Sequence, residues 1–176
     1  MHPDQADVLE AIRTSIFELD GMIGPRRSAM VVSGSMVPPF RGVSTNEAPQ
    51  YATFRVMVAP ILGTLGFSDV TLDTGCMCRL PNLAVSIAAA NCPMSEPVCN
   101  LLDTMRRSGI GRGFATDGIR WAQGRSDGRR VRITHVVDLS PYFIEVLDRM
   151  RFRESVEADR TELSLFVETF SKDADG

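Results

Sequence analysis

The chain has 176 residues, a formal net charge of −3 and a sequence pI near 5.4. This length is typical of one domain with one hydrophobic core. The weakly acidic balance excludes a protein that is basic throughout, so any contact with nucleic acid requires a local patch of positive charge. No apolar run approaches the roughly 20 residues that span a bilayer, and the polar N-terminus does not resemble a secretory signal. We therefore expect a cytoplasmic protein with no membrane partner.

The basic residues are almost all arginines. Of the 19 basic residues, Lys172 is the single lysine. Lysine is the usual neutralisable amine of catalytic sites, whereas arginine stays protonated. Chemistry that needs a lysine amine earlier in the chain is therefore excluded.

The first 50 residues are predicted to form a helix followed by an irregular segment. Apolar residues recur at helical spacing over residues 5–20, which indicates an amphipathic helix that ends near Gly21. Residues 21–50 are interrupted by Gly, Pro and Ser, and within them the apolar run 29–32 favours a short strand.

A second helix and a strand are predicted next. Residues 50–65 carry apolar residues on one helical face, and Gly66 suits the C-terminal cap. Pro60 is expected to kink this helix because it removes a backbone hydrogen bond. Residues 70–72 then favour a strand.

The middle of the chain is predicted to form a pair of strands and a helix. Residues 77–80 and 83–90 favour strands, and the second is apolar on both faces, as a central buried strand would be. Residues 96–108 have the helical pattern, with Arg106 and Arg107 in the last turn, where positive charge suits the helix dipole.

Two hairpins are predicted after this helix. Asp117-Gly118 lies between the apolar runs 113–116 and 119–122, which is a strong hairpin signal. Residues 126–129 resemble a second turn, and residues 131–139 favour the strand that follows it.

The C-terminal part is predicted to be helical. Ser140 and Pro141 suit the N-cap and first position of one helix, and a final helix is expected over residues 159–171, capped by Asp159 or Thr161. We therefore expect one domain, made of an N-terminal helix and irregular segment (1–49), a core (50–139) and C-terminal helices (140–176).

Part of this core resembles a known family. The helix of residues 50–67 ends in Leu-Gly-aromatic, and the hairpin carries Thr-Asp-Gly-x-x-Trp at Thr116, Asp117, Gly118 and Trp121. On these pieces, residues 50–125 resemble the N-terminal nuclease domain of type I restriction enzyme R subunits, in the PD-(D/E)XK superfamily. The resemblance implies an α/β, restriction-endonuclease-like three-layer core, with a central mixed sheet flanked by helices and extra N- and C-terminal helices.

The resemblance also implies where an active site would lie. In that family one strand supplies an Asp and the next a Glu-x-Lys; the carboxylates hold Mg²⁺ and the lysine stabilises negative charge. Here alanines stand near the expected Glu and Lys, at Ala88 and Ala90. Asp73 fits the first acidic position, although the segment from Cys76 to Cys78 fits that strand as well, and Glu96 is the one other nearby carboxylate. The active site is therefore predicted to be degenerate.

Three functions follow as hypotheses. The first is a non-catalytic binding or assembly module without a cofactor, which contacts DNA or RNA or joins a larger restriction-type assembly. The second is a divergent nuclease that uses Asp73, Glu96 and magnesium. The third is a structural homodimer with no role in nucleic-acid binding. Fold class by itself does not choose among them.

Arginines around the hairpins are the strongest nucleic-acid signal. Interleaved with Trp121, they could follow a phosphate backbone; the alternative is a solvated strand face that compensates acidic residues elsewhere. The candidate set is Arg106, Arg107, Arg112, Arg120, Arg125, Arg129 and Arg130, with Arg132 beside it.

The cysteines raise the question of a zinc site. Cys76, Cys78, Cys92 and Cys99 lie within 24 residues, but without the usual C-x₂-C pairs. Cys76 and Cys78 would share one face of a strand, which favours a metal; the alternative is four small residues of a reduced core. His135 alone does not make a catalytic triad.

Overall fold

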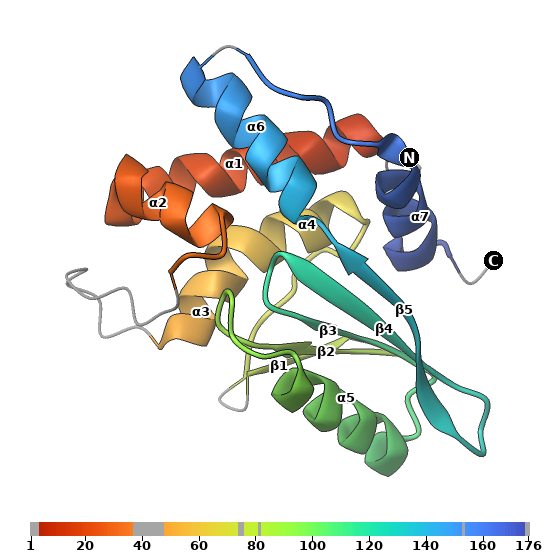
Figure 1. The fold of residues 1–176 in the computed structure, drawn as a ribbon. Coiled ribbons are helices and arrows are strands. Elements are labelled where there is room, and N and C mark those ends of the chain that lie inside the picture. The colour runs from red at the N-terminus through yellow and green to blue at the C-terminus, as the bar shows by residue number, and fades with distance from the viewer. Residues whose placement is uncertain (1–3, 37–47, 74–75, 81, 153, 175–176) are drawn as a thin grey trace.

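The computed structural model describes residues 4–36, 48–73, 76–80, 82–152 and 154–174. These residues form an α/β fold around a five-stranded mixed sheet with the strand order β1-β2-β3-β4-β5 (Figure 1). All neighbouring strands are antiparallel except β2 and β3, which are parallel. The strands are β1 (Met77–Leu80), β2 (Leu83–Ile87), β3 (Arg112–Thr116), β4 (Arg120–Ser126) and β5 (Val131–Asp138).

Helices cover both faces of the sheet, which confirms the predicted α/β class with a central mixed sheet. Helix α5 (Ser95–Ser108) connects β2 to the parallel β3 and covers one face. The other helices lie on the opposite side of the sheet (Figure 1). They are α1 (Gln5–Ile23), α2 (Pro25–Val32), α3 (Pro49–Thr53), the π-helical η1 (Phe54–Val58), α4 (Ala59–Thr64), α6 (Ser140–Phe152) and α7 (Arg160–Phe170).

The main core lies between the sheet and the larger helical layer. Its centre is aromatic: Trp121 on β4 meets Phe166 of α7 edge-to-face at 5.5 Å between ring centroids, and Phe114 on β3 meets Phe170 at 5.0 Å. All four rings are fully buried. Burying such rings supplies much of the apolar area that stabilises the fold.

Helix α5 packs against two glycines of the sheet. Gly113 on β3 and Gly124 on β4 are direct cross-strand partners, and Leu101 and Met105 of α5 lie over them. A Cβ at Gly113 would lie 2.5 Å from Leu101 Cδ1 and 2.9 Å from the carbonyl oxygen of Ala84. The helix can approach the sheet this closely because no side chain stands between them.

We expect Gly113→Ala to destabilise the protein by about 2 kcal/mol, because an added methyl group overpacks a site closed by backbone. Gly111→Ala is the matched control, since nothing lies within 4 Å of its Cβ position. Urea denaturation monitored by Trp121 fluorescence measures both. Equal stability of the two variants would contradict the close packing.

A buried ion pair ties α6 to the segment that begins α7. The carboxylate of Glu145, 2% exposed, accepts two hydrogen bonds of 2.7 Å from the Arg160 guanidinium and one of 2.9 Å from the Ala158 N–H. The hydrogen bonds from Arg160 are the main cause that holds the pKa of Glu145 below its usual 4.5. Paired charge of this kind is stabilising only while both partners are present.

Glu145→Gln should therefore destabilise the protein by about 2 kcal/mol near pH 7. Because the folded-state pKa of Glu145 is lowered, its contribution is present above the unfolded pKa and is lost as the pH falls through the folded value. The difference between wild type and variant, measured by urea denaturation, should shrink as the pH falls below 4.5, the ordinary pKa of this carboxyl. The control is Glu157→Gln: Glu157 also contacts Arg160, at 3.3 Å, but is exposed, and should change little. A difference in the free energy of unfolding that does not change with pH would contradict the ion pair as its cause.

Most predicted elements are confirmed, with four corrections. The strand predicted over residues 83–90 ends at Ile87. The run 29–32 is not a strand but the second half of α2, which begins at Pro25 after Gly24; a proline at the first helical position starts a helix efficiently. Residues 70–72 form no strand either. The predicted helix end near Gly21 extends to Ile23.

Pro60 causes a different irregularity from the predicted kink. The segment before it, η1, has π-helical hydrogen bonding, and the N–H of Ala59 donates to the carbonyl of Phe54. Proline has no N–H for the ordinary helical bond, and a π-turn absorbs this defect within one continuous helical run.

Among the described helices, none combines the length and apolarity needed to cross a bilayer.

Candidate functional site

A cavity of about 450 Å³ lies where β2 ends and α5 begins. We call it the Ser86 cavity. Residues from α3, the segment before β1, β2, the β2–α5 loop and the first turns of α5 form its walls. The described lining residues are Gln50, Cys76, Ser86, Ile87, Ala88, Ala89, Cys92, Pro93, Ser95, Glu96, Pro97 and Asn100.

Four consecutive residues at the end of β2 and just after it line this cavity: Ser86, Ile87, Ala88 and Ala89. Ser86 is 2% exposed, and its Oγ is not among the enclosed unpaired polar atoms of the described residues. Ala90, the second alanine that the sequence resemblance singles out, is buried in the main core, and its N–H donates to Thr53 Oγ1 at 3.0 Å. The end of β2 therefore brings one hydroxyl and apolar groups to the cavity.

The two carboxylates of the nuclease hypothesis have different environments. Glu96 lines the cavity from the first turn of α5. Asp73 holds the turn before β1: its Oδ1 accepts from the Met77 N–H at 3.0 Å, and its carbonyl accepts from the Cys76 N–H at 3.1 Å. Asp73 is not among the described lining residues.

The four cysteines are not brought together. Cys76 has a left-handed backbone (φ 57°), so it leaves the strand pattern and lines the cavity, whereas Cys78 is buried in the main core. Cys92 also lines the cavity and Cys99 is exposed. Within the described ranges, no three His, Cys, Asp or Glu side chains are placed to share a metal. The expectation that Cys76 and Cys78 share a strand face is therefore wrong.

Three cysteine thiols have raised pKa values. Burial, and after it the Asp73 carboxylate, raise the pKa of Cys78 to about 12. The pKa of Cys76 is raised by burial and then by Asp73 and Glu96, and burial is also the main cause that raises the pKa of Cys92. A neutral thiol is a weak nucleophile and a poor metal ligand.

The Thr116–Trp121 motif forms a tight hairpin. Asp117 is fully buried, and its carboxylate accepts from the backbone N–H groups of Ile119 and Arg120 and from the Arg120 guanidinium. Gly118 has a φ of 89° and lies so close to Met57 that a Cβ would be 2.8 Å from it. The motif residues thus have structural roles in the turn and the core.

Three members of the predicted nucleic-acid set have structural roles. Trp121 is fully buried, so its ring is not available to stack on a base. Arg112 is 5% exposed and donates to the carbonyl oxygens of Thr169 and Ser171 at the C-terminal end of α7. Arg120 pairs with Asp117. Sequence spacing did not reveal these roles, because they depend on contacts with distant segments.

The exposed arginines gather at one end of the molecule, which we call the arginine end. The last turn of α5 and the β4–β5 turn lie near each other there (Figure 1). Arg106 pairs with Asp103 at 2.9 Å, whereas the other four form no ion pair with any described residue. The arginine end consists of Arg106, Arg107, Arg129, Arg130 and Arg132; Arg125 is half-buried beside it, opposite Arg132 in the sheet.

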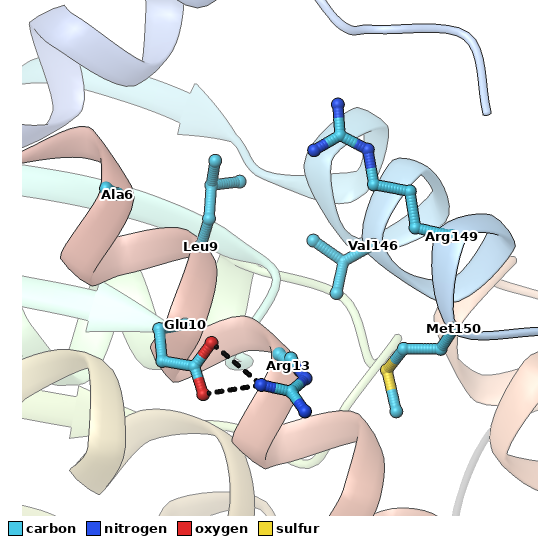
Figure 2. A pocket seen from close by; sticks show the side chains of 7 residues that line it. All are labelled: Ala6, Leu9, Glu10, Arg13, Val146, Arg149 and Met150. Carbon is cyan, nitrogen blue, oxygen red and sulfur yellow. Dashed lines mark hydrogen bonds and ion pairs between the residues drawn. The ribbon is translucent and has the colours of Figure 1, made fainter. Parts of the chain in front are cut away.

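A second hollow of about 560 Å³ lies between α1 and α6 (Figure 2). Leu9 and Val146 line it from the two helices, with Met150 beyond them. On its α1 side, Glu10 and Arg13 form an exposed ion pair at 3.0 Å (Figure 2). This is a surface groove with an apolar floor and one exposed charge pair.

The histidines do not add a catalytic group. His135 is exposed on β5, with its Nδ1 3.2 Å from both Gln123 Oε1 and Thr134 Oγ1. His2 lies outside the described residues.

Comparison with protein-family models, curated proteins and solved structures finds no match for this chain. Its function therefore has to be inferred from its own residues.

Proposed function

We propose that this chain is a non-catalytic, restriction-endonuclease-like domain that acts as a binding module and contacts nucleic acid through its arginine end. The element order α4, β1, β2, α5, β3, with β2 parallel to β3 across α5, supports the fold assignment. The hairpin with Thr116, Asp117, Gly118 and Trp121 lies directly after it, where the sequence resemblance puts it.

The observation that carries the non-catalytic part is the chemistry of the Ser86 cavity. Metal-dependent phosphodiester cleavage needs at least two carboxylates that share a cation, and a positive group that stabilises negative charge. The described lining has one carboxylate, Glu96, and no arginine or lysine. Ser86 at the end of β2 and Ala88 just after it line this space, and neither is ionisable.

The arginine end supports the nucleic-acid part. Guanidinium groups bind phosphate oxygens bidentately and keep their charge at all physiological pH values. Arg107, Arg129, Arg130 and Arg132 are exposed and form no ion pair with a described residue. Asp127 of the β4–β5 turn accepts from the backbone N–H groups of Arg129 and Arg130, so positive side chains outnumber the carboxylate there. Such contacts position a phosphate backbone without reading base sequence.

We expect weak, salt-dependent binding to DNA or RNA, measured by fluorescence anisotropy with labelled oligonucleotides at about 50 and 200 mM salt. The triple variant Arg107→Ala, Arg129→Ala, Arg130→Ala should reduce affinity at least about tenfold and lower the salt slope by about 3, one for each lost phosphate contact. A matched triple variant of the helical layer, with alanine at Arg13, Arg26 and Arg55, should bind like wild type.

Two outcomes would contradict the proposal. Binding that is absent, or independent of salt, would remove the nucleic-acid part. Cleavage of the oligonucleotides with magnesium or manganese, lost in Glu96→Gln or Asp73→Asn, would establish the divergent nuclease instead.

Exposed phenylalanines favour a second candidate function, a structural homodimer. Phe17 on α1 is 69% exposed and Phe152 at the end of α6 is 70% exposed, on helices that pack against each other. Large exposed apolar side chains are typical of protein interfaces when they lie together.

If this surface forms a homodimer, light scattering at micromolar concentration should give twice the mass of the chain, and Phe17→Glu with Phe152→Glu should give the monomer. Burying a charge at an apolar interface is costly, which is the reason for the expected dissociation. Val136→Glu is the control, because Val136 is also 70% exposed but lies on β5. A monomeric wild type would remove this candidate.

A further inference from the structure

We propose that the Ser86 cavity binds a small uncharged heterocycle of the nucleobase class, as a free base or nucleoside. This inference is independent of the arginine end, because the cavity lies at the opposite end of α5. That helix has 14 residues, which makes it about 20 Å long.

The cavity has a suitable size and shape. Its volume of about 450 Å³ falls in the range typical of small-molecule sites. The lining combines apolar groups, Ile87, Ala88 and Pro93, with polar ones, which suits a ligand that has an apolar face and polar edges.

Ser86 is the observation that points to a ligand. Its side chain lies on a central strand, is 2% exposed, and lines the cavity with no hydrogen-bond partner among the described residues. Its hydroxyl is not among the enclosed unpaired polar atoms of the described residues, so it is accessible from the cavity, where it can both donate to and accept from a ligand. A ligand with a polar edge would satisfy it.

The remaining polar groups combine donors and acceptors. Gln50 and Asn100 enter the cavity lining from α3 and from α5, and Glu96 adds a carboxylate acceptor. Carboxamides pair bidentately with the adjacent donor and acceptor of a base edge, and carboxylates accept from exocyclic amino groups. This set matches heterocyclic amides and amino-heterocycles.

The charges of the lining disfavour a phosphate. No arginine or lysine is among the described lining residues, and Glu96 would repel an anion. Cys76 and Cys92 stay neutral because burial raises the pKa of both thiols. The base or nucleoside is therefore preferred over its nucleotide.

The test is isothermal titration calorimetry of the full chain with adenosine, guanosine, cytidine and uridine, and with their 5′-monophosphates. At least one nucleoside should bind with a dissociation constant below about 1 mM, and its monophosphate at least about fivefold more weakly. Ser86→Ala and Glu96→Gln should each weaken nucleoside binding about fivefold, because the first removes a hydrogen bond and the second replaces a charge-assisted hydrogen bond with a neutral one. Ala88→Leu, which fills the cavity, should abolish it.

The matched control is Glu162→Gln, in the first turn of α7 as Glu96 is in the first turn of α5, and it should bind like wild type. Thermal melting of each variant separates lost binding from lost folding, and Ser86→Ala keeps the test valid if Ala88→Leu does not fold. Absence of binding by all four nucleosides, tighter binding of the monophosphates, or unchanged binding in Ser86→Ala and Glu96→Gln would overturn the inference. None of these results depends on the arginine end.

Discussion

The close approach of α5 to the sheet is the constraint on which both candidate surfaces depend. Gly113 and Gly124 are paired across β3 and β4, and a side chain at either position would meet Leu101 or Met105 of the helix. Protein interiors are packed so densely that a single added methyl group can lower the stability of the fold. With its distance from the sheet set in this way, α5 brings its first turn against the end of β2 and its last turn near the β4–β5 turn.

The two ends of α5 therefore present different chemistry. At its N-terminal end the helix contributes Glu96 and Asn100 to a cavity without positive side chains in its described lining. At its C-terminal end it contributes Arg106 and Arg107 to the arginine end. Negative charge near a helix start and positive charge near its end both stabilise the helix. The same distribution separates the surface proposed to bind phosphates from the cavity proposed to bind an uncharged ligand.

The opposite side of the sheet is built for stability. There the aromatic core joins β3 and β4 to α7, while Glu145 and Arg160 connect α6 to the start of α7. Arg112 donates to backbone carbonyls at the other end of α7, so arginine serves here as a helix cap. The same residue type thus stabilises the fold at Arg112 and is exposed to solvent at the arginine end, and its contacts decide which.

Local pattern alone determined much of this protein. Periodicity placed α1, α5, α7 and the strands, and Asp117-Gly118 predicted the hairpin, because helix and strand periods and turn preferences act over a few residues. The absence of an acid and an amine at the end of β2 was also visible in the sequence. Tertiary structure decided that Trp121 and Arg112 are buried, that Cys76 and Cys78 separate, and that Ser86 faces a cavity. These properties depend on segments far apart in the chain, and no local pattern contains that information.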